Sequence, residues 1–116
     1  MARAPDHYAL SLRCRLKAEQ ELELNDLLTA AEMMWGAVVH AIKHIAPRFT
    51  SARLNSHREV KQAVPVLDLN LSGVDLREEF GNAEALHRYF YRVHFADHQV
   101  RNSFRRCQRL LDALLA

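Results

Sequence analysis

NDLLTAAEMMWGAVVHAIKHIA, residues 25–46, decides the fold of this 116-residue chain. Its apolar side chains recur every three or four residues and cover most of the circumference of a helix, so neighbours must cover it on several sides. Asn25 or Asp26 can cap the first turn, and Pro47 stops the helix. A thin polar strip carries Thr29, Gly36, His40, Lys43 and His44. The stretch predicts the central helix of a bundle, over about residues 26–46.

The rest of the chain has the length and composition of one globular domain. Of the residues, 49% are hydrophobic and 26% are charged, as in an ordinary globular protein. Three glycines and three prolines leave room for few tight turns, so no sheet is expected. The net charge of +2 favours no class of partner. We therefore predict a single all-α domain over residues 1–116.

Cysteine use and hydropathy indicate the setting in which the protein works. Cys14 and Cys107 lie far apart on apolar helix faces and lack the spacing of paired metal ligands, which predicts two buried, reduced thiols. The first residues lack the basic start and continuous apolar run of a secretion signal. No segment approaches the roughly 20 apolar residues that a membrane span needs. We expect a soluble, cytoplasmic protein without a membrane partner.

Capping residues predict four further helices. Asp6 can cap a first helix that runs to about Leu22, and a very short turn makes this helix antiparallel to the central one. The apolar side of the first helix is expected to comprise Tyr8, Ala9, Leu12 and Leu16. Residues 56–59, SHRE, form a capping box that begins a third helix, which Pro65 is expected to kink or to end early.

The C-terminal third completes the bundle. Residues 67–75 are predicted to be a loop, and a second capping box at residues 75–78 begins a fourth helix that runs to about Phe95. The expected core stripe of this helix is Phe80, Ala83, Leu86, Phe90 and Val93. Asp97 is expected to cap the last helix, whose apolar repeat is Val100, Phe104, Cys107, Leu111 and Leu114. The pattern predicts a compact five-helix up-and-down bundle.

The central helix also bears on oligomeric state. It is more apolar than four short neighbours can comfortably cover, so part of its surface is expected to need another partner. A second copy of the chain is the simplest such partner, because most soluble oligomers are symmetric. The sequence therefore predicts a homodimer with a two-fold interface.

Three segments together carry a family resemblance: AAEMMWGAVVHAIKHIA, SHREV and ALHRYFY. In this order and spacing they resemble the PaREP family of HEPN-like domains, which are small all-helical proteins of prokaryotes. The matching positions are Trp35, Gly36 and Ala37, then Ser56, His57 and Arg58, then Leu86, His87, Phe90 and Tyr91. The resemblance implies a four- or five-helix bundle, often dimeric, that is tied to nucleotide or RNA chemistry. Many members of the wider HEPN group are metal-independent ribonucleases, toxins or partners of nucleotidyltransferases.

The chain departs from the ribonuclease signature of that group, which is an arginine, often a polar residue, and a histidine four to six residues later. Arg88 and His94 have the spacing, but Tyr89 occupies the polar position. On a regular helix Arg88 and His94 lie about 120° apart, so one phosphate could not easily contact both. Arg101 and Asn102 have the right dipeptide, but no histidine follows them.

Candidate catalytic residues lie on the predicted fourth helix. His87, Tyr91 and His94 follow one another at intervals of about one helical turn beside the apolar stripe. Imidazole and phenol groups can hydrogen-bond a base or ribose, stack on it, or transfer a proton. The alternative is that these are half-buried packing residues whose polar tips bond backbone or water.

Two groups of basic residues are candidates for phosphate binding. His57 and Arg58 begin the third helix, where free backbone amides and the helix dipole favour an anion. An arginine ladder, spaced by four residues along the last helix, comprises Arg101, Arg105 and Arg109. Arg88 adds to the basic character of this third of the chain, which can track phosphates. The alternative is a solvated face that pairs with the acids of the first helices.

No metal or cofactor is expected. His40 and His44 have the spacing of two ligands on one helical face, but no carboxylate lies nearby in sequence to serve as a third. The sequence therefore predicts a nucleotide- or RNA-associated domain of HEPN type. Two alternatives stay open: a metal-independent ribonuclease or toxin with a degenerate Arg-x5-His motif, and a non-catalytic interaction module. The module would pair with a nucleotidyltransferase or with a toxin–antitoxin partner.

Overall fold

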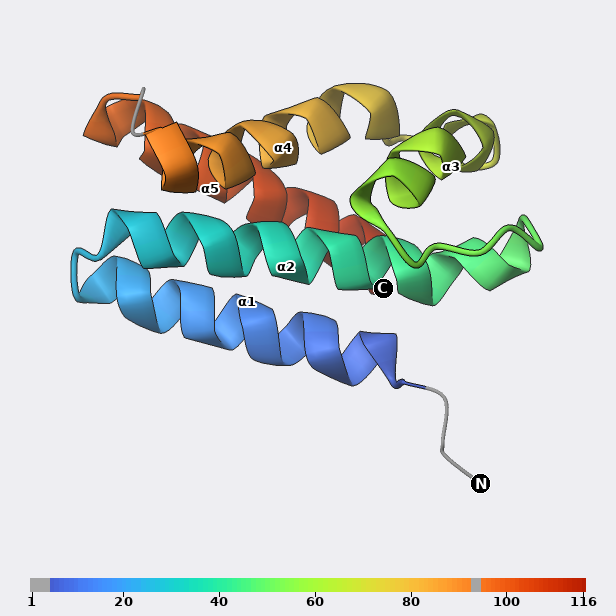
Figure 1. Ribbon diagram of the computed structural model, residues 1–116, viewed down its shortest axis with the longest axis horizontal. Helices are drawn as coiled ribbons and strands as arrows, with labels where there is room; N and C mark the ends of the chain where they lie inside the picture. Colours follow the sequence, from blue (N-terminus) through green and yellow to red (C-terminus); the bar gives the residue numbers. More distant parts are fainter. Residues whose placement is uncertain (1–4, 93–94) are drawn as a thin grey trace.

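The computed structural model describes residues 5–92 and 95–116, and it confirms the all-α class with five helices (Figure 1). The helices are α1 (His7–Glu23), α2 (Leu27–Ile45), α3 (His57–Leu69), α4 (Leu76–Arg92) and α5 (Asp97–Leu114). A short 3₁₀ turn, Ala46–Arg48, follows α2 at Pro47. The described residues contain no strand, and none of their helices is long and apolar enough to cross a membrane.

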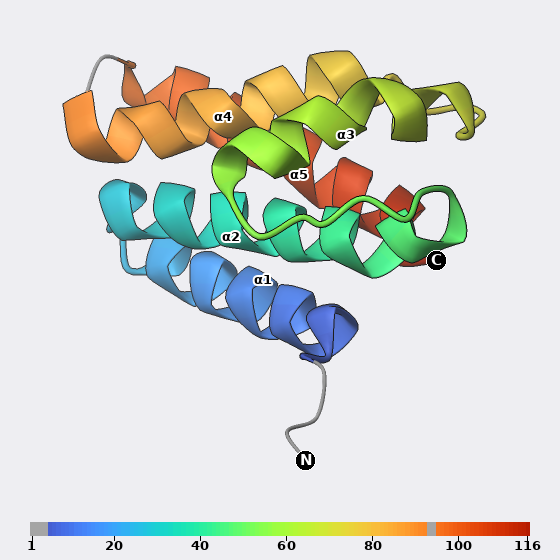
Figure 2. The same ribbon diagram turned by 45° about the vertical axis from the view of Figure 1, so that its right-hand side comes forward.

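Helix α2 lies at the centre of the molecule, as the sequence predicts. Helix α1 runs antiparallel beside one face of α2, whereas α4 and α5 cover another face (Figures 1 and 2). Helix α3 lies mainly against α4 and contacts α2 as well. Ten residues of α2 are buried, including Met34 and Val38, which are fully enclosed. The neighbours therefore cover this helix within a single chain. An uncovered central helix is thus no longer a reason to expect a homodimer, and the homodimer itself stays a prediction.

Side chains cap four of the five helices as predicted. Asp6 and Asp26 accept hydrogen bonds from the amides three residues later, at 3.1 Å in each case. Ser56 and Asp75 do the same at the starts of α3 and α4. The prediction for Asp97 is wrong: it is the first residue of α5, where the Ala96 amide donates to the side chain of Gln99 at 2.8 Å.

Helix α1 packs through a face that the sequence does not predict. Tyr8, Leu12 and Leu16 were expected to be its apolar side, yet they are 40%, 41% and 58% exposed. Ser11 and Ala18 are buried instead, and the Ser11 hydroxyl donates to the Ala37 carbonyl at 2.7 Å. This face of α1 packs against α2 through small side chains, with Cys14 opposite Gly36. A Cβ atom added at Gly36 would lie 3.4 Å from the sulfur of Cys14.

The two cysteines are unpaired, but they are not equally enclosed. Cys14 is half-buried between α1 and α2, whereas Cys107 is fully buried in the core. Burial raises the pKa of Cys107 to about 12, and the charge of Glu79 contributes to the same direction. The prediction of two buried thiols therefore holds for Cys107 and only in part for Cys14.

Two expectations for α3 and α4 are also corrected. Helix α3 continues for four residues beyond Pro65, so the predicted loop begins only after Leu69. Proline removes the hydrogen bond to the carbonyl four residues earlier, at Lys61, which lies on the exposed side of α3 where water can replace it. In α4, Tyr89 is 4% exposed and takes the core position expected of Phe90, which is 37% exposed. Val93 lies outside the described residues.

Candidate functional site

Histidines from two helices converge over the tryptophan of the central helix. The ring of Trp35 stacks on His87 with a centroid separation of 5.1 Å, and it lies 4.9 Å from the ring of His57. The two imidazoles are 5.7 Å apart, and Phe80 closes the inner side of the cluster at 5.5 Å from Trp35. We call this surface the two-histidine face; it comprises Glu32, Trp35, His57, Glu84, His87 and Tyr91.

Each element brings one part of this face for a local reason. Trp35 belongs to the buried surface of α2 and is 7% exposed, so its ring has a fixed position under the two histidines. His57 is the first residue of α3, directly after the Ser56 cap, so the start of that helix fixes its position. His87 and Glu84 are three residues apart on α4 and therefore project from neighbouring positions of one helical surface.

A carboxylate holds each histidine. Nε2 of His57 lies 2.9 Å from Oε2 of Glu84, and Nδ1 of His87 lies 2.9 Å from Oε1 of Glu32. The side chain of Glu84 is 11% exposed against 45% for His57, so this acid sits behind its imidazole, whereas Glu32 and His87 are about equally exposed, at 23% and 25%. Lys61 contacts Glu84 at 3.4 Å, which adds a cation at the rim.

These pairs determine which imidazole nitrogens remain available. An ionised carboxylate only accepts hydrogen bonds, so the proton of a neutral imidazole must sit on the nitrogen that faces it. Nδ1 of His57 and Nε2 of His87 are left over, and no hydrogen bond joins either atom to another described residue. The face therefore offers two imidazole nitrogens that can accept a proton or, after protonation, donate one.

Tyr91 supplies an exposed aromatic ring at the edge of the face. Its side chain is 69% exposed, and its ring lies 5.2 Å from His87 at an interplanar angle of 81°. Phe90 contacts Tyr91 edge-on at 5.1 Å. The predicted third member of this row, His94, lies outside the described residues.

Of the predicted basic residues, only some accompany the histidines. Arg58 follows His57 in the first turn of α3, and Arg88 follows His87 in α4. Both arginines are exposed, and neither has a hydrogen bond or ion pair with another described residue. Tyr89, which is buried, is not available to stack on a base.

The arginine ladder of α5 makes no described contact with the two-histidine face. Arg101 donates to the side chain of Asn25 in the α1–α2 turn at 2.7 Å, and Arg105 donates to Asn102 within its own helix. Arg109 is exposed and lines a different hollow. The sequence-predicted phosphate ligands therefore fall into two separate groups.

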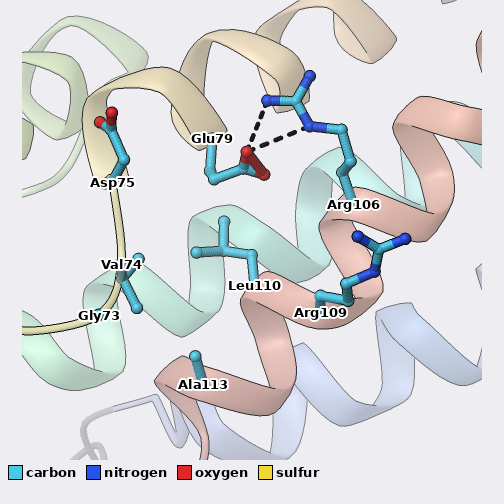
Figure 3. A pocket seen from close by; sticks show the side chains of 8 residues that line it. All are labelled: Gly73, Val74, Asp75, Glu79, Arg106, Arg109, Leu110 and Ala113. Atoms are coloured by element: carbon cyan, nitrogen blue, oxygen red, sulfur yellow. Dashed lines mark hydrogen bonds and ion pairs between the residues drawn. The ribbon is translucent and has the colours of Figure 1, made fainter.

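That hollow is an open pocket of about 360 Å³ between α5 and the beginning of α4 (Figure 3). Arg106 donates to Oε1 of Glu79 through Nη2 at 2.6 Å and through Nε at 3.1 Å, and Arg109 lies on the same wall. Asp75 and Glu79 bring two carboxylates to the pocket, which offset the two guanidinium groups. The charges thus give this pocket no preference for a phosphate.

No described group of three or more His, Cys, Asp or Glu side chains is arranged to hold a metal ion. His40 contacts His7 rather than His44: the two Nδ1 atoms lie 2.9 Å apart. At the two-histidine face, the acids are bonded to the imidazole nitrogens themselves. The acids therefore serve as hydrogen-bond partners of the histidines in this arrangement.

Sequence reasoning found three of the six residues of the two-histidine face. It selected His57, His87 and Tyr91, and it treated Trp35 only as a core residue. It missed Glu32 and Glu84. The hydrogen-bond partner of each acid lies on another helix, so no pattern within one helix indicates either residue.

The model of the archaeal PaREP1/PaREP8 family matches residues 6–111, which is most of the chain. No curated protein and no solved structure matches significantly. The match extends from the start of α1 into the last turns of α5, so it includes all six residues of the two-histidine face.

Proposed function

The chain belongs to the archaeal PaREP1/PaREP8 family, and we propose that it is a nucleotide- or RNA-associated domain of HEPN type. The ligand lies on the two-histidine face. The observation that carries this proposal is the convergence of His57 and His87, 5.7 Å apart, over Trp35. The free imidazole nitrogens can hydrogen-bond a phosphate, and the exposed tyrosine beside them can stack on a base, so the face is suited to a ligand that has both.

The chemistry of each group supports a nucleotide. Imidazolium donates charge-assisted hydrogen bonds to phosphate oxygens, and the guanidinium of Arg58 can approach the same oxygens from the first turn of α3. Tyr91, 69% exposed, offers a ring on which a base can stack. Lys61 at the rim adds a further positive charge.

The extent of the face favours a small nucleotide or a short RNA segment over a long strand. Its aromatic and imidazole groups lie within neighbouring turns of three helices. A long strand would need a continuous track of cations, and the ladder of α5 makes no described contact with this face. The salt dependence of binding is therefore expected to be shallow.

The test is a titration of short RNAs and mononucleotides at two salt concentrations. We expect a mononucleotide to bind with little dependence on salt, and His87→Ala to abolish binding. The matched control replaces Arg101, Arg105 and Arg109 by Glu, which should leave binding unchanged. A steep loss of RNA affinity with salt, together with loss of binding in the triple variant, would assign the ligand to the ladder instead.

A ribonuclease is the second candidate, and the pair of free imidazole nitrogens favours it. Removing a proton from a 2′-hydroxyl and returning one to the 5′-oxygen requires one base and one acid, which two histidines can supply. Cleavage of an RNA oligonucleotide, but not of its 2′-deoxy analogue, would support this activity. His57→Ala and His87→Ala should each abolish it, and uncut RNA at all pH values would exclude it.

The remaining alternative is a protein-interaction module. If no nucleotide or RNA binds at either salt concentration, the partner is a protein, such as a nucleotidyltransferase or the other half of a toxin–antitoxin pair. A co-purification experiment with the product of an adjacent gene, followed by measurement of the purified complex, distinguishes this case. Loss of the complex in His87→Ala would assign the interface to the two-histidine face.

A further inference from the structure

We infer that the two-histidine face binds phosphate together with protons, because its two glutamates leave the outward imidazole nitrogens as acceptors until the rings are protonated. The inference rests on the proposed function and adds to it the ligand class, a phosphate ester, and a dependence on pH. It concerns Nδ1 of His57 and Nε2 of His87, the two nitrogens that no described group occupies.

The argument begins with the single proton of a neutral imidazole. At His57 this proton lies on Nε2, because Oε2 of Glu84 is 2.9 Å away and a carboxylate cannot donate. Nδ1 then carries a lone pair. A phosphate oxygen is also an acceptor, so neutral His57 and phosphate repel each other. Only the imidazolium form donates to Glu84 and to a phosphate at the same time.

The same reasoning applies to His87 with the two nitrogens exchanged. Oε1 and Oε2 of Glu32 lie 2.9 Å and 3.1 Å from Nδ1, so the free atom is Nε2. The ring centroids of the two histidines are 5.7 Å apart. The rings are therefore neighbours, and in this proposal each protonated ring donates one charge-assisted hydrogen bond to the same phosphate.

The charges around the face match a protonated pair. Glu32 from α2 and Glu84 from α4 oppose the two imidazolium charges, and Lys61 from α3 contacts Glu84 at 3.4 Å. Arg58 and Arg88 flank the histidines on α3 and α4 and have no described partner. With both rings protonated, the face has an excess of positive charge that an anion neutralises.

Glutamine at the two acidic positions distinguishes control of the imidazole proton from a purely structural role of the glutamates. A Gln amide can donate to the imidazole as well as accept from it, so the neutral ring can place its proton on the outward nitrogen. Glu32→Gln and Glu84→Gln together should therefore permit phosphate binding without proton uptake. The matched control is Glu78→Gln, an exposed acid of α4 that contacts Arg106 rather than the face.

The ligand in the experiment is a dinucleoside monophosphate, because a phosphodiester keeps one negative charge over the whole pH range, whereas a phosphomonoester titrates near pH 6. Adenosine, which lacks phosphate, is the comparison ligand. Calorimetric titrations are performed between pH 5.5 and pH 8.5. Two buffers with different ionisation enthalpies report the number of protons taken up.

For the wild-type protein we expect the affinity for the dinucleotide to fall at least tenfold between pH 6 and pH 8, since each coupled proton contributes up to about tenfold per pH unit. Proton uptake should accompany binding of the dinucleotide, and adenosine should show neither effect. The double glutamine variant should bind with a flat pH profile, and Glu78→Gln should keep the wild-type slope.

Two results would overturn the inference in distinguishable ways. If the wild-type protein binds the dinucleotide equally well at pH 6 and pH 8 without proton uptake, the proton coupling is wrong and the proposed function stands. If neither the dinucleotide nor any nucleotide binds at any pH, both are wrong. The wild-type measurements decide the matter even if the double variant does not fold.

Discussion

Nδ1 of His7 lies 2.9 Å from Nδ1 of His40, with the two rings stacked at a centroid separation of 5.2 Å. One ring must donate and the other must accept, so the contact survives only while at least one imidazole is neutral. It joins the first residue of α1 to the C-terminal part of α2. Together with the contact between the rings of Tyr8 and His44, it holds the N-terminal end of α1 against α2.

This pair predicts loss of stability in acid. The pKa of His7 is lowered, mainly by burial and then by the charge of Lys43. The pKa of His40 is lowered too, mainly by burial and then by the charge of His7. Below the ordinary value of 6.5, the unfolded chain therefore binds more protons than the folded one. The contribution of the pair to stability is complete above that pH and is lost as the pH falls through the lowered values.

Denaturant unfolding at pH 7.5 and pH 5.0 measures this effect. The free energy of unfolding should fall between the two pH values, and His40→Gln should make the fall smaller. His98→Gln is the control, because His98 is exposed and should leave the slope unchanged. A wild-type protein that is equally stable at both pH values would contradict the prediction.

Trp35 gives a prediction about the core beneath the candidate site. Its side chain is 7% exposed and contacts the rings of His57, Phe80 and His87. Replacing it by Ala should lower the free energy of unfolding by about 3–5 kcal/mol, as for other large-to-small core changes. Trp35→Phe keeps part of the ring and should cost less. A loss below about 1 kcal/mol for the alanine variant would mean that the site is not built on this residue.

Tyr91 tests the role of stacking in ligand binding. Its ring is largely exposed, so Tyr91→Ala should leave thermal stability nearly unchanged. Nucleotide affinity should weaken by about 1–3 kcal/mol, the range for loss of a base–aromatic stack. Tyr91→Phe keeps the ring and should bind almost as well as the wild type. An equal loss in both variants would assign the contribution to the hydroxyl group instead.

The sequence predicts the helices better than it predicts their contacts. The apolar repeat of α5 fixes its buried face, and all five predicted residues from Val100 to Leu114 are buried. Helix α1 has a weak apolar pattern, and its buried face includes Ser11, whose hydroxyl donates to the Ala37 carbonyl of α2. That hydrogen bond is a property of the helix pair and is not visible in the pattern of α1 alone.

The candidate site shows the same division. The family resemblance selects His57, His87 and Tyr91 because they belong to recurring segments. The acids Glu32 and Glu84 become meaningful only when α2, α3 and α4 are placed together, since their partners are 55 and 27 residues away in sequence. Long-range hydrogen bonds of this kind follow from tertiary packing, and no local pattern encodes them.

The homodimer stays a prediction, and the structure changes where its interface is expected. With α2 covered, α1 is the described helix that exposes three large apolar side chains, which are Tyr8, Leu12 and Leu16. These three residues follow one another at intervals of four along one side of α1. Two α1 helices related by a two-fold axis would bury this apolar row against its copy.

Light scattering over a range of concentrations measures the mass of the particle. We expect a dimer for the wild type and a monomer for Leu16→Lys, because a charge replaces an apolar side chain that is 58% exposed in the single chain. The control is Val66→Lys on α3, where the side chain is 45% exposed and lies on a different helix. Val66→Lys should stay dimeric and unfold at the temperature of the wild type, and Leu16→Lys should keep its helical content, since neither side chain is in the core. A wild-type monomer at every concentration would exclude the dimer, and a dimer that persists in Leu16→Lys would exclude α1 as its interface.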